Sequence, residues 1–280
     1  MRVKYIKVGL LAFFMMVGCE QTETVGHGQK GAGDEIDTPV SIGEEHEAIE
    51  EPSLIVDDEV EQVDITEKES EVKYKINRDN WKVEPLEGGI EQVVLLTIDD
   101  APNDFSIEMA ETLQEIDAPA IFFVNGHFIA DEAGEDKLRT LHEMGFEIGN
   151  HTMNHPNMGD ISMEEQRREI VELNDLIEEI IGERPRFYRA PFGVNTETSE
   201  AVMIEEDMTS MNWTYGYDWE ANYQNAEALA DIMVNTPYLT AGANLLMHDR
   251  QWTLGALTDI VTGLREKGYE IVDPKEIKTK

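Results

Sequence analysis

The sequence is poor in cysteine, in basic residues and in long apolar runs, and each shortage excludes a class of protein. Cys19 is the only cysteine of the 280 residues, so no disulfide framework can form within the chain. Lys and Arg number 22 against 59 Asp and Glu, which gives a formal net charge of -37. Such acidity argues against a nucleic-acid partner and against direct adhesion to anionic lipid.

An apolar stretch from Val8 to Val17 follows a basic start of the chain. It is shorter than the roughly 20 residues that span a membrane, so residues 1–18 are interpreted as a secretory signal peptide, with a plain transmembrane anchor as the alternative. Gly18 before Cys19 resembles the bacterial lipobox, whose new amino-terminal cysteine is acylated, although Met16 stands at the usual leucine position. Both interpretations predict an exported chain held at the outer face of the cell membrane.

Between Glu20 and Glu71 the chain is strongly acidic, with 18 Asp or Glu against 2 Lys and few aromatic residues. Such a composition cannot bury enough apolar surface to offset the entropy lost on ordering, and its like charges repel. Residues 19–80 are therefore predicted to be a disordered tether. A flexible chain of about 60 residues has a typical end-to-end distance of about 40 to 45 Å, which gives reach away from a membrane.

From residue 81 to residue 280 the composition becomes that of one globular domain. The clearest helix is expected over 163–181, where apolar residues recur at helical spacing and Gly182 provides a stop signal. Seven strands alternating with six helices predict an α/β protein whose mostly parallel sheet curls into a distorted (β/α)7 barrel. The expected strands are 93–98, 120–124, 146–149, 186–189, 209–213, 243–247 and 269–272, and the other expected helices are 105–117, 134–144, 197–207, 225–235 and 254–267.

Five groups of polar residues follow predicted strands. Parallel strands place their carboxyl ends on one face, where barrels of this kind carry their chemistry, so the five groups are expected to converge. They are Asp99 and Asp100, His151 and His155, Arg189, Asp218 and Trp219, and His248 and Asp249.

Asp99 and Asp100 end the apolar run 93–98. A strand so apolar is expected to be buried on both faces, so these charges lie at the rim of a core. Successive strand side chains point to opposite faces, which predicts that the two carboxylates lie on opposite sides of the strand end and do different jobs. A polar turn is the alternative interpretation of the same residues.

His151 and His155 lie four residues apart, so a tight loop or one helical turn can direct both imidazoles at one cation. A carboxylate from another strand end would complete a two-His, one-Asp site with positions open for water and substrate. That set suits Zn²⁺ and also Co²⁺, Mn²⁺ or Fe²⁺. A purely structural role for two hydrogen-bonded histidines is the alternative.

A metal site with open positions needs a proton acceptor and a proton donor beside it. Asp99, next to a metal-binding Asp100, is the natural acceptor, and His248 is the natural donor because an imidazolium titrates near neutral pH. Arg189 is expected to hold Asp99 ionised through a bidentate pair. A hydrogen-bonded loop histidine and an ordinary surface ion pair are the respective alternatives.

Five short runs carry these residues: Thr97–Pro102 (TIDDAP), His151–Pro156 (HTMNHP), Arg189–Gly193 (RAPFG), Asp218–Trp219 (DW) and Leu246–His248 (LMH). In this order they resemble the five motifs of the polysaccharide deacetylases, the NodB homology domain of carbohydrate esterase family four. The resemblance covers about residues 90 to 280 and implies a distorted (β/α) barrel. It also implies a metal-dependent deacetylase.

The resemblance implies roles for the residues of the first three runs. Asp99 would be the base, and Arg189 would orient it. Asp100, His151 and His155 would bind the metal, for which Zn²⁺ is the first expectation.

The resemblance further implies how substrate is held and protonated. His248 would be the acid, tuned by Asp218, and the backbone N–H of Phe192 would hold the oxyanion. Leu246 would line the pocket for the acetyl methyl group. Pro191 and Trp219 are expected beside the substrate, although the aromatic residues near the motifs can equally be core residues; these are Phe192, Tyr215, Tyr217, Trp219 and Trp252.

Two positions depart from the family pattern. Ala101 replaces a glycine of the usual first motif, and because residues before proline favour extended conformations that alanine adopts easily, we expect little effect. The fourth motif usually carries a further acid three residues before the aspartate of the Asp-Trp pair, and the run Trp213–Trp219 lacks it. The rim is therefore expected to differ there, while the metal ligands are unaffected.

The function expected from these residues is metal-dependent hydrolysis of N-acetyl groups on an extracellular polysaccharide, with peptidoglycan favoured over chitin-like polymers. An inactive glycan-binding protein on the same fold is one alternative, and a deacylase or esterase for another substrate, such as acetylated xylan, is another. We expect a monomer, anchored through a lipid on Cys19.

Overall fold

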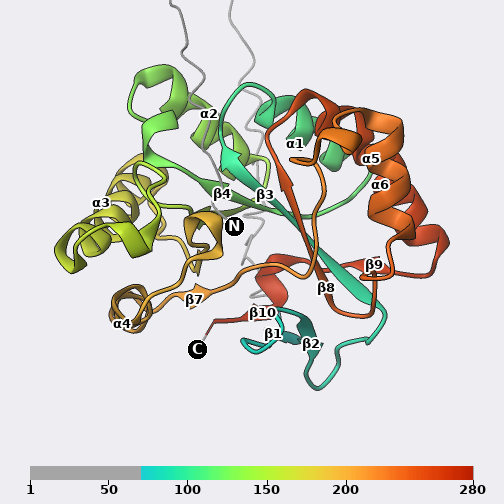
Figure 1. Cartoon of the computed structure of the whole chain (residues 1–280), viewed down its shortest axis with the longest axis horizontal. Coiled ribbons are helices and arrows are strands. Elements are labelled where there is room, and N and C mark those ends of the chain that lie inside the picture. Colours follow the sequence, from blue (N-terminus) through green and yellow to red (C-terminus); the bar gives the residue numbers. More distant parts are fainter. Residues whose placement is uncertain (1–70, 280) are drawn as a thin grey trace, which may run out of the picture. The chain divides into compact units, whose positions relative to one another are not determined.

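Strand β3 (Val93–Ala101) runs through the middle of a parallel sheet in the computed structural model, which describes residues 71–279 (Figure 1). The order of the strands is β7-β6-β5-β4-β3-β8, every pairing between them is parallel, and β9 pairs with the start of β3. The other strands of this sheet are β4 (Ile121–Val124), β5 (Glu147–Asn150), β6 (Phe187–Tyr188), β7 (Thr209–Ser210), β8 (Ala243–His248) and β9 (Glu270–Ile271).

The chain segment after β7 joins the two edges of this sheet. Tyr215 forms a parallel bridge with Leu245 of β8, and the Thr214 N–H donates to the carbonyl oxygen of Asn244 at 2.8 Å. The sheet thus curls into a barrel, which confirms the predicted fold class. Each predicted strand and helix is present, with ends that differ by a few residues.

Within the described residues, six α-helices cover the outside of the sheet, with α1, α5 and α6 on one side of β3 and α3 and α4 on the other (Figure 1). Helix α3 matches its predicted range because its end signals are complete: Ser162 and Glu165 form a capping box, and Gly182 closes the helix with φ 79°. The helices are α1 (Ser106–Glu115), α2 (Glu132–Glu143), α3 (Met163–Ile181), α4 (Glu197–Glu205), α5 (Ala226–Asn235) and α6 (Gln251–Glu266). None of the helices within residues 71–279 is long and apolar enough to cross a membrane.

Alternate residues of β3 belong to two separate apolar cores. Val94, Leu96 and Ile98 join the core between the sheet and its helices, whereas Val93 and Leu95 join the core inside the barrel. Because side chains alternate along a strand, the inner row continues with Thr97 and Asp99. The inner face of β3 therefore changes from apolar to polar toward its carboxyl end, where the candidate site lies.

A small second sheet closes the amino end of the barrel. It contains β1 (Tyr74–Ile76), β2 (Val83–Pro85) and β10 (Ile277–Lys278), and its buried residues Tyr74 and Ile76 pack into the inner core. The predicted boundary at residue 81 is therefore wrong for residues 74–76. The signal in β1 was too short to recognise, because its partner β10 lies about 200 residues further along the chain. The predicted signal peptide, Cys19 and the predicted tether up to residue 70 lie outside the described residues.

Candidate active site

Arg189 is buried inside the barrel and holds Asp99. Its Nη1 donates to Asp99 Oδ1 at 2.7 Å and to Thr97 Oγ1 at 2.7 Å, and its guanidinium lies 4.3 Å from the ring centre of Phe123. Both ion-pair partners are almost fully buried, with side-chain exposures of 0% for Arg189 and 3% for Asp99. The remaining donors reach the carbonyl oxygens of Met211 and Asn212 and Oδ1 of Asn244. The expected pairing of Arg189 with Asp99 is present, through one oxygen rather than as a bidentate fork.

The two adjacent aspartates face the same pair of histidines. Asp99 Oδ2 lies 3.6 Å from His151 Nε2, and Asp100 Oδ1 lies 3.6 Å from His155 Nε2. The expectation that they lie on opposite sides of the strand end is therefore wrong. The pairing register of β3 with β4 shifts between Ile98 and Ala101, and Asp100 has a left-handed backbone with φ 61°. Such an irregularity re-aims a side chain at a strand end, so strict alternation fails there.

The histidines are oriented by their surroundings at the end of β5. His151 Nδ1 lies 2.7 Å from the carbonyl oxygen of Arg189, which can only accept, so Nδ1 carries the proton and Nε2 is left as the ligand atom. Asn125 Nδ2 donates to the carbonyl oxygen of His151 at 2.6 Å. His155 has a left-handed backbone with φ 55°, and its ring centre lies 4.9 Å from that of His151. The loop between them thus turns both rings toward Asp100.

Asp100, His151 and His155 can hold a divalent metal. Each offers one ligand atom, and the three atoms lie within 4.8 Å of one another. Two ligands of a tetrahedral zinc centre lie about 3.3 to 3.4 Å apart, close to the separation of 3.6 Å between Asp100 Oδ1 and His155 Nε2. The chemistry of these three groups therefore fits Zn²⁺ and similar divalent ions.

The electrostatics of these ligands suit a cation. Burial lowers the pKa of His151, which favours the neutral imidazole that a metal requires. Burial raises the pKa of Asp100, but the charge interactions with His248, His151, His155 and, least of all, Arg250 together lower it by more, so the net shift favours the carboxylate. Both ligands are thus in the protonation state that binds metal.

His248 lies across the rim and is held by Asp218. The register of β3 and β8 places His248 opposite Asp99, and its Nδ1 lies 2.7 Å from Asp218 Oδ1. Asp218 Oδ2 also accepts from the backbone N–H of His248 at 2.6 Å and from Thr253 Oγ1 at 2.9 Å. Burial lowers the pKa of His248, but the hydrogen bond and charge of Asp218 raise it by more, so the net pKa lies above the ordinary value for histidine.

Two of the five aromatic candidates are exposed beside the site. Trp219 is 47% exposed, with its ring centre 5.5 Å from that of His248, and Phe192 is 66% exposed, with its ring centre 4.9 Å from that of His155. The other three form hydrogen bonds within the protein. The Tyr215 hydroxyl donates to the carbonyl oxygen of Met233 in α5, and the Tyr217 hydroxyl lies 2.6 Å from Thr236 Oγ1 at the end of α5. Trp252 Nε1 donates to the carbonyl oxygen of Asp218.

Phe192 and its neighbours occupy a turn after β6. Phe192 has a left-handed backbone, with φ 58° and ψ 11°, inside the short 3₁₀ helix Pro191–Gly193. Gly193 is also left-handed, and a Cβ there would meet the Trp213 ring at 3.1 Å. Pro191 is buried, as is Leu246, which pairs with Thr97 across β3 and β8. Phe192, Pro191 and Leu246, three of the four expected substrate residues, thus lie on the chain segments that carry Arg189 and His248.

The two departures from the family pattern have simple structural outcomes. Tyr215 stands where the further acid of the fourth motif is expected, and it is buried, with its hydroxyl donating to the carbonyl oxygen of Met233 in α5 at 2.8 Å. The rim there is tied to a helix rather than carrying a charge. Ala101 remains part of β3 and accepts the Asn125 N–H at 3.0 Å, as the expectation of little effect requires.

Arg250 and Asn244 were not predicted to belong to this network, and Asp249 was expected at this rim without an assigned role. Arg250 Nη2 donates to Asp100 Oδ2 at 3.0 Å, and Asn244 contacts Arg189. The buried carboxylate of Asp249 accepts hydrogen bonds from the loop after β3. Arg250 and Asp249 directly follow His248, so their position at a strand end was a usable signal. Asn244 lies inside the apolar run of β8 and gave none.

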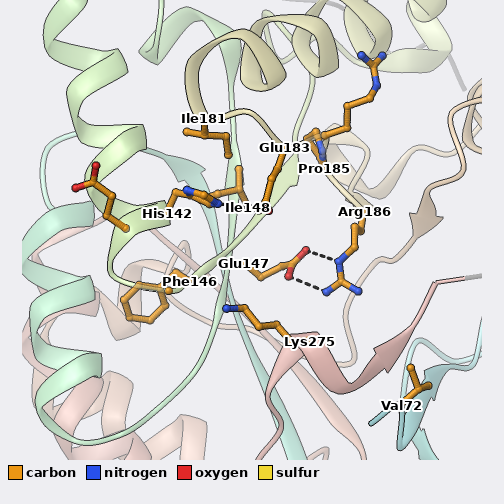
Figure 2. A pocket seen from close by; sticks show the side chains of 13 residues that line it. Val72, His142, Phe146, Glu147, Ile148, Ile181, Glu183, Pro185, Arg186 and Lys275 are labelled. Carbon is orange, nitrogen blue, oxygen red and sulfur yellow. Dashed lines mark hydrogen bonds and ion pairs between the residues drawn. The ribbon is translucent and has the colours of Figure 1, made fainter. Parts of the chain in front are cut away.

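A pocket of about 1190 Å³ lies at the opposite end of the strands, and none of the candidate site residues lines it (Figure 2). Glu147, at the start of β5, accepts two hydrogen bonds from Arg186 at 2.7 and 3.1 Å. His142 Nε2 lies 3.4 Å from Glu183. These charged lining residues are paired with one another, so the pocket offers no set of converging ligand atoms comparable to that at the rim.

Comparison with known proteins connects this site to carbohydrate chemistry. A family profile described as polysaccharide deacetylase matches residues 87–211. A peptidoglycan-N-acetylglucosamine deacetylase from Bacillus cereus is 30% identical over 187 residues, which cover 64% of this chain and 68% of that protein. The peptidoglycan-N-acetylmuramic acid deacetylase PdaC from Bacillus subtilis is 29% identical over 191 residues, or 67% of this chain.

The matches cover only part of some relatives. The chain spans 39% of the length of PdaC and 63% of the length of YlxY, an uncharacterized protein of Bacillus subtilis. Among solved structures, a CE4 family pseudoenzyme from Bacillus anthracis matches with a TM-score of 0.61 and 26% identity, over 67% of each chain. A mutant of that pseudoenzyme has restored enzymatic activity.

Proposed function

This chain belongs to the polysaccharide deacetylase family, and on that premise we propose that it hydrolyses N-acetyl groups on an extracellular polysaccharide. The observation that carries the proposal is that three groups of side chains converge at one rim of the barrel. A candidate metal triad, a carboxylate held by a buried arginine, and an imidazole held by a buried carboxylate all face the same space. Together they supply the electrophile, base and acid that amide hydrolysis requires.

Asp100, His151 and His155 would hold the metal. When bound, a divalent metal supplies Lewis-acid polarisation of the acetyl carbonyl and lowers the pKa of water. His151 keeps its Nε2 lone pair available because Nδ1–H donates to the Arg189 carbonyl oxygen. The same arginine thus supports a metal ligand through its backbone and Asp99 through its side chain.

Asp99 is the proposed base. It accepts a proton at Oδ2 as water oxygen forms its bond with the acetyl carbon, while Arg189 remains on Oδ1. The backbone N–H of Phe192 would donate to the carbonyl oxygen as negative charge develops there. Phe192 lies beside the metal triad, since its ring centre is 4.9 Å from that of His155.

His248 is the proposed acid. Its Nε2 donates a proton to the sugar nitrogen as the C–N bond breaks, which releases acetate and a free amine. Asp218 holds Nδ1 and raises the pKa of the ring against the effect of burial, so the imidazolium is present near neutral pH. Buried Leu246 would face the acetyl methyl group.

Peptidoglycan is the proposed substrate polymer. Two of the relatives described above support this choice. One is a peptidoglycan-N-acetylglucosamine deacetylase, and the other is a peptidoglycan-N-acetylmuramic acid deacetylase. Exposed Trp219 and Phe192 flank the two histidines and can stack on sugar faces. A monomer is sufficient, since every proposed site residue comes from one chain.

We propose further that the protein is exported and held at the outer face of the membrane through a lipid on Cys19. The support is the sequence of residues 1–19 alone, with its basic start, apolar stretch and small residue before cysteine. Metabolic labelling with a fatty acid should mark the chain and should fail for Cys19→Ser. Labelling of that variant would contradict the anchor.

Acetate release by the purified, zinc-loaded chain tests the proposed activity. Peptidoglycan, chitin oligomers and acetylated xylan are compared, each with and without a chelator. We expect release from peptidoglycan that the chelator stops and zinc restores. Faster release from chitin oligomers or xylan would overturn the proposed polymer but not the chemistry.

An inactive glycan-binding protein is the second candidate, because a structure similar to this chain is described as a pseudoenzyme. The presence of base, acid and metal ligands at one rim argues against it here. Saturable binding of peptidoglycan without acetate release from any substrate, in a chain that holds stoichiometric zinc, would favour that candidate.

A further inference from the structure

Arg250 links the ends of two neighbouring strands at the rim. Its Nη1 donates to the carbonyl oxygen of Asp249 at 2.9 Å, after β8, and its Nη2 donates to Asp100 Oδ2 at 3.0 Å, near the end of β3. Asp249 is itself fixed, because its buried carboxylate accepts hydrogen bonds from the N–H groups of Asn103 and Phe105. The guanidinium is therefore anchored on rigid backbone before it reaches Asp100.

The two oxygens of Asp100 have different partners. Oδ1 lies 3.6 Å from His155 Nε2, on the side of the candidate metal triad, and Oδ2 lies on Arg250. The side chain of Asp100 is 19% exposed, so it lies at the rim rather than in the closed core. Within the part of the chain that the structure describes, the side-chain hydrogen bond to this carboxylate comes from Arg250. Removing that bond frees the carboxylate to turn.

We propose that Arg250 is a positioning residue for the metal site, and this rests on the proposed metal-dependent function. It holds Oδ2 of Asp100 so that Oδ1 faces the two imidazoles. The carboxylate then offers one oxygen to a metal and leaves other coordination positions open. Arg250 acts through Asp100 and does not itself contact the metal.

The same logic already applies to another ligand of the triad. His151 is oriented by an outer partner, the carbonyl oxygen of Arg189. Outer partners of this kind fix ligand orientation, and their loss typically weakens metal binding by about 10- to 100-fold. Arg250 supplies to the carboxylate what Arg189 supplies to the imidazole.

Charge and orientation oppose each other at this position. A guanidinium near a dication disfavours metal binding, whereas a carboxylate held in the binding orientation favours it. The Arg250 side chain is 38% exposed, so water and salt screen its repulsion of the metal. The hydrogen bond of 3.0 Å is directional, so it can fix the orientation of the carboxylate even where charge is screened. We therefore expect orientation to outweigh repulsion.

Zinc titration calorimetry on the full chain tests this inference. Arg250→Ala should bind Zn²⁺ about 10- to 100-fold more weakly than the unchanged chain. Arg250→Lys should lie between them, because one ammonium cannot replace a fork that spans Asp249 and Asp100. The matched control is Arg139→Ala, which removes a surface arginine paired with Glu135 and should leave zinc affinity unchanged. The absorption spectrum of bound Co²⁺ should change in Arg250→Ala and not in the control.

The outcomes separate this inference from the proposed function. Zinc affinity of Arg250→Ala equal to or tighter than that of the unchanged chain would overturn the positioning role, provided that Asp100→Ala abolishes binding. Equal zinc affinity of Asp100→Ala and the unchanged chain would instead overturn the metal triad itself. Circular dichroism of each variant checks that it is folded.

Discussion

The two ends of the same parallel strands carry similar side chains in opposite arrangements. At the carboxyl ends, the three candidate metal ligands direct their donor atoms at one another within 4.8 Å. At the amino ends, Glu147 is paired with Arg186, and His142 faces Glu183 (Figure 2). Strand β5 contributes to both ends, because it begins at Glu147 in the pocket and ends at Asn150, next to His151. Among residues 71–279, the group of three ligand atoms that could hold a cation lies at the carboxyl ends.

This difference teaches that converging donors, rather than cavity size, locate the chemistry. The pocket of about 1190 Å³ lies at the amino ends, where Glu147 is paired with Arg186 and His142 lies beside Glu183. At the rim, one oxygen of Asp100 and one ring nitrogen each of His151 and His155 converge, while Arg250 holds the other oxygen of Asp100. Titratable groups gathered in this way are typical of functional sites. The variants below compare matched residues at the two ends, from the largest expected effect to the smallest.

Replacing a histidine should give the largest difference in activity between variants at the carboxyl ends and at the amino ends of the strands. His155→Ala removes a proposed metal ligand, so acetate release should fall by about 1,000-fold or more, together with the zinc content of the chain. His142→Ala, in the pocket, should leave both unchanged. Acetate release and zinc by elemental mass spectrometry check this, and an active, zinc-replete His155→Ala would contradict it.

Replacing Asp99 should show that this carboxylate acts as the base and is not a metal ligand. Asp99→Asn should lower kcat by about 100- to 10,000-fold while the chain keeps its zinc, because the variant cannot take the proton of water. Glu147→Gln should keep full activity and lower the free energy of unfolding by about 1 kcal/mol or less, since its pair with Arg186 is partly exposed. Wild-type turnover by Asp99→Asn would show that another group is the base.

Asp218→Asn should move the alkaline limb of the pH profile. His248 must be protonated to act as acid, and Asp218 raises its pKa, so the variant should lose activity at lower pH than the unchanged chain. Activity on that limb should fall about tenfold for each unit of pKa lost. An unchanged alkaline limb in the profile of kcat/KM against pH would contradict this role.

The same pair links stability to pH. The folded-state pKa of His248 lies above its unfolded value, so the stability it contributes is present below the unfolded pKa. That stability is lost as pH rises through the folded pKa. Urea denaturation of Asp218→Asn should therefore show a weaker pH dependence across this window.

Exposed aromatic residues should give the smallest effect. Trp219→Ala should raise KM for a glycan by about 3- to 10-fold with little change in kcat, because stacking on a sugar is worth about 0.5 to 1.5 kcal/mol. Tyr238, which is 63% exposed and precedes β8 at the amino end, is the matched control. Equal effects of Trp219→Ala and Tyr238→Ala would remove Trp219 from the substrate site.

Periodicity and motif order predicted the barrel and the convergence of its strand ends well, because buried strands and capped helices leave strong local signals. Helix α3 was predicted to the residue, since Ser162, Glu165 and Gly182 mark its ends. The short strand β1 was not, because three residues just after an acidic stretch carry little signal without their distant partner β10. Tertiary pairing decided that segment.

The direction of Asp100 could not be predicted from strand alternation. Alternation holds as far as Asp99, and the register shift after Ile98 then turns the next carboxylate toward the same histidines. A left-handed aspartate is uncommon and leaves no pattern in a single sequence. Asn244 was missed for a related reason, because a polar residue inside an apolar strand reveals its partner only when the barrel closes.

The division of labour between the adjacent aspartates is the central claim. Anomalous diffraction from crystals of the zinc-loaded chain, collected at the zinc edge, tests it most directly. The account predicts one strong peak at the rim, coordinated by Asp100, His151 and His155, with Asp99 still paired with Arg189. A peak coordinated by Asp99 instead of Asp100, or one found only in the pocket beside His142, would contradict it.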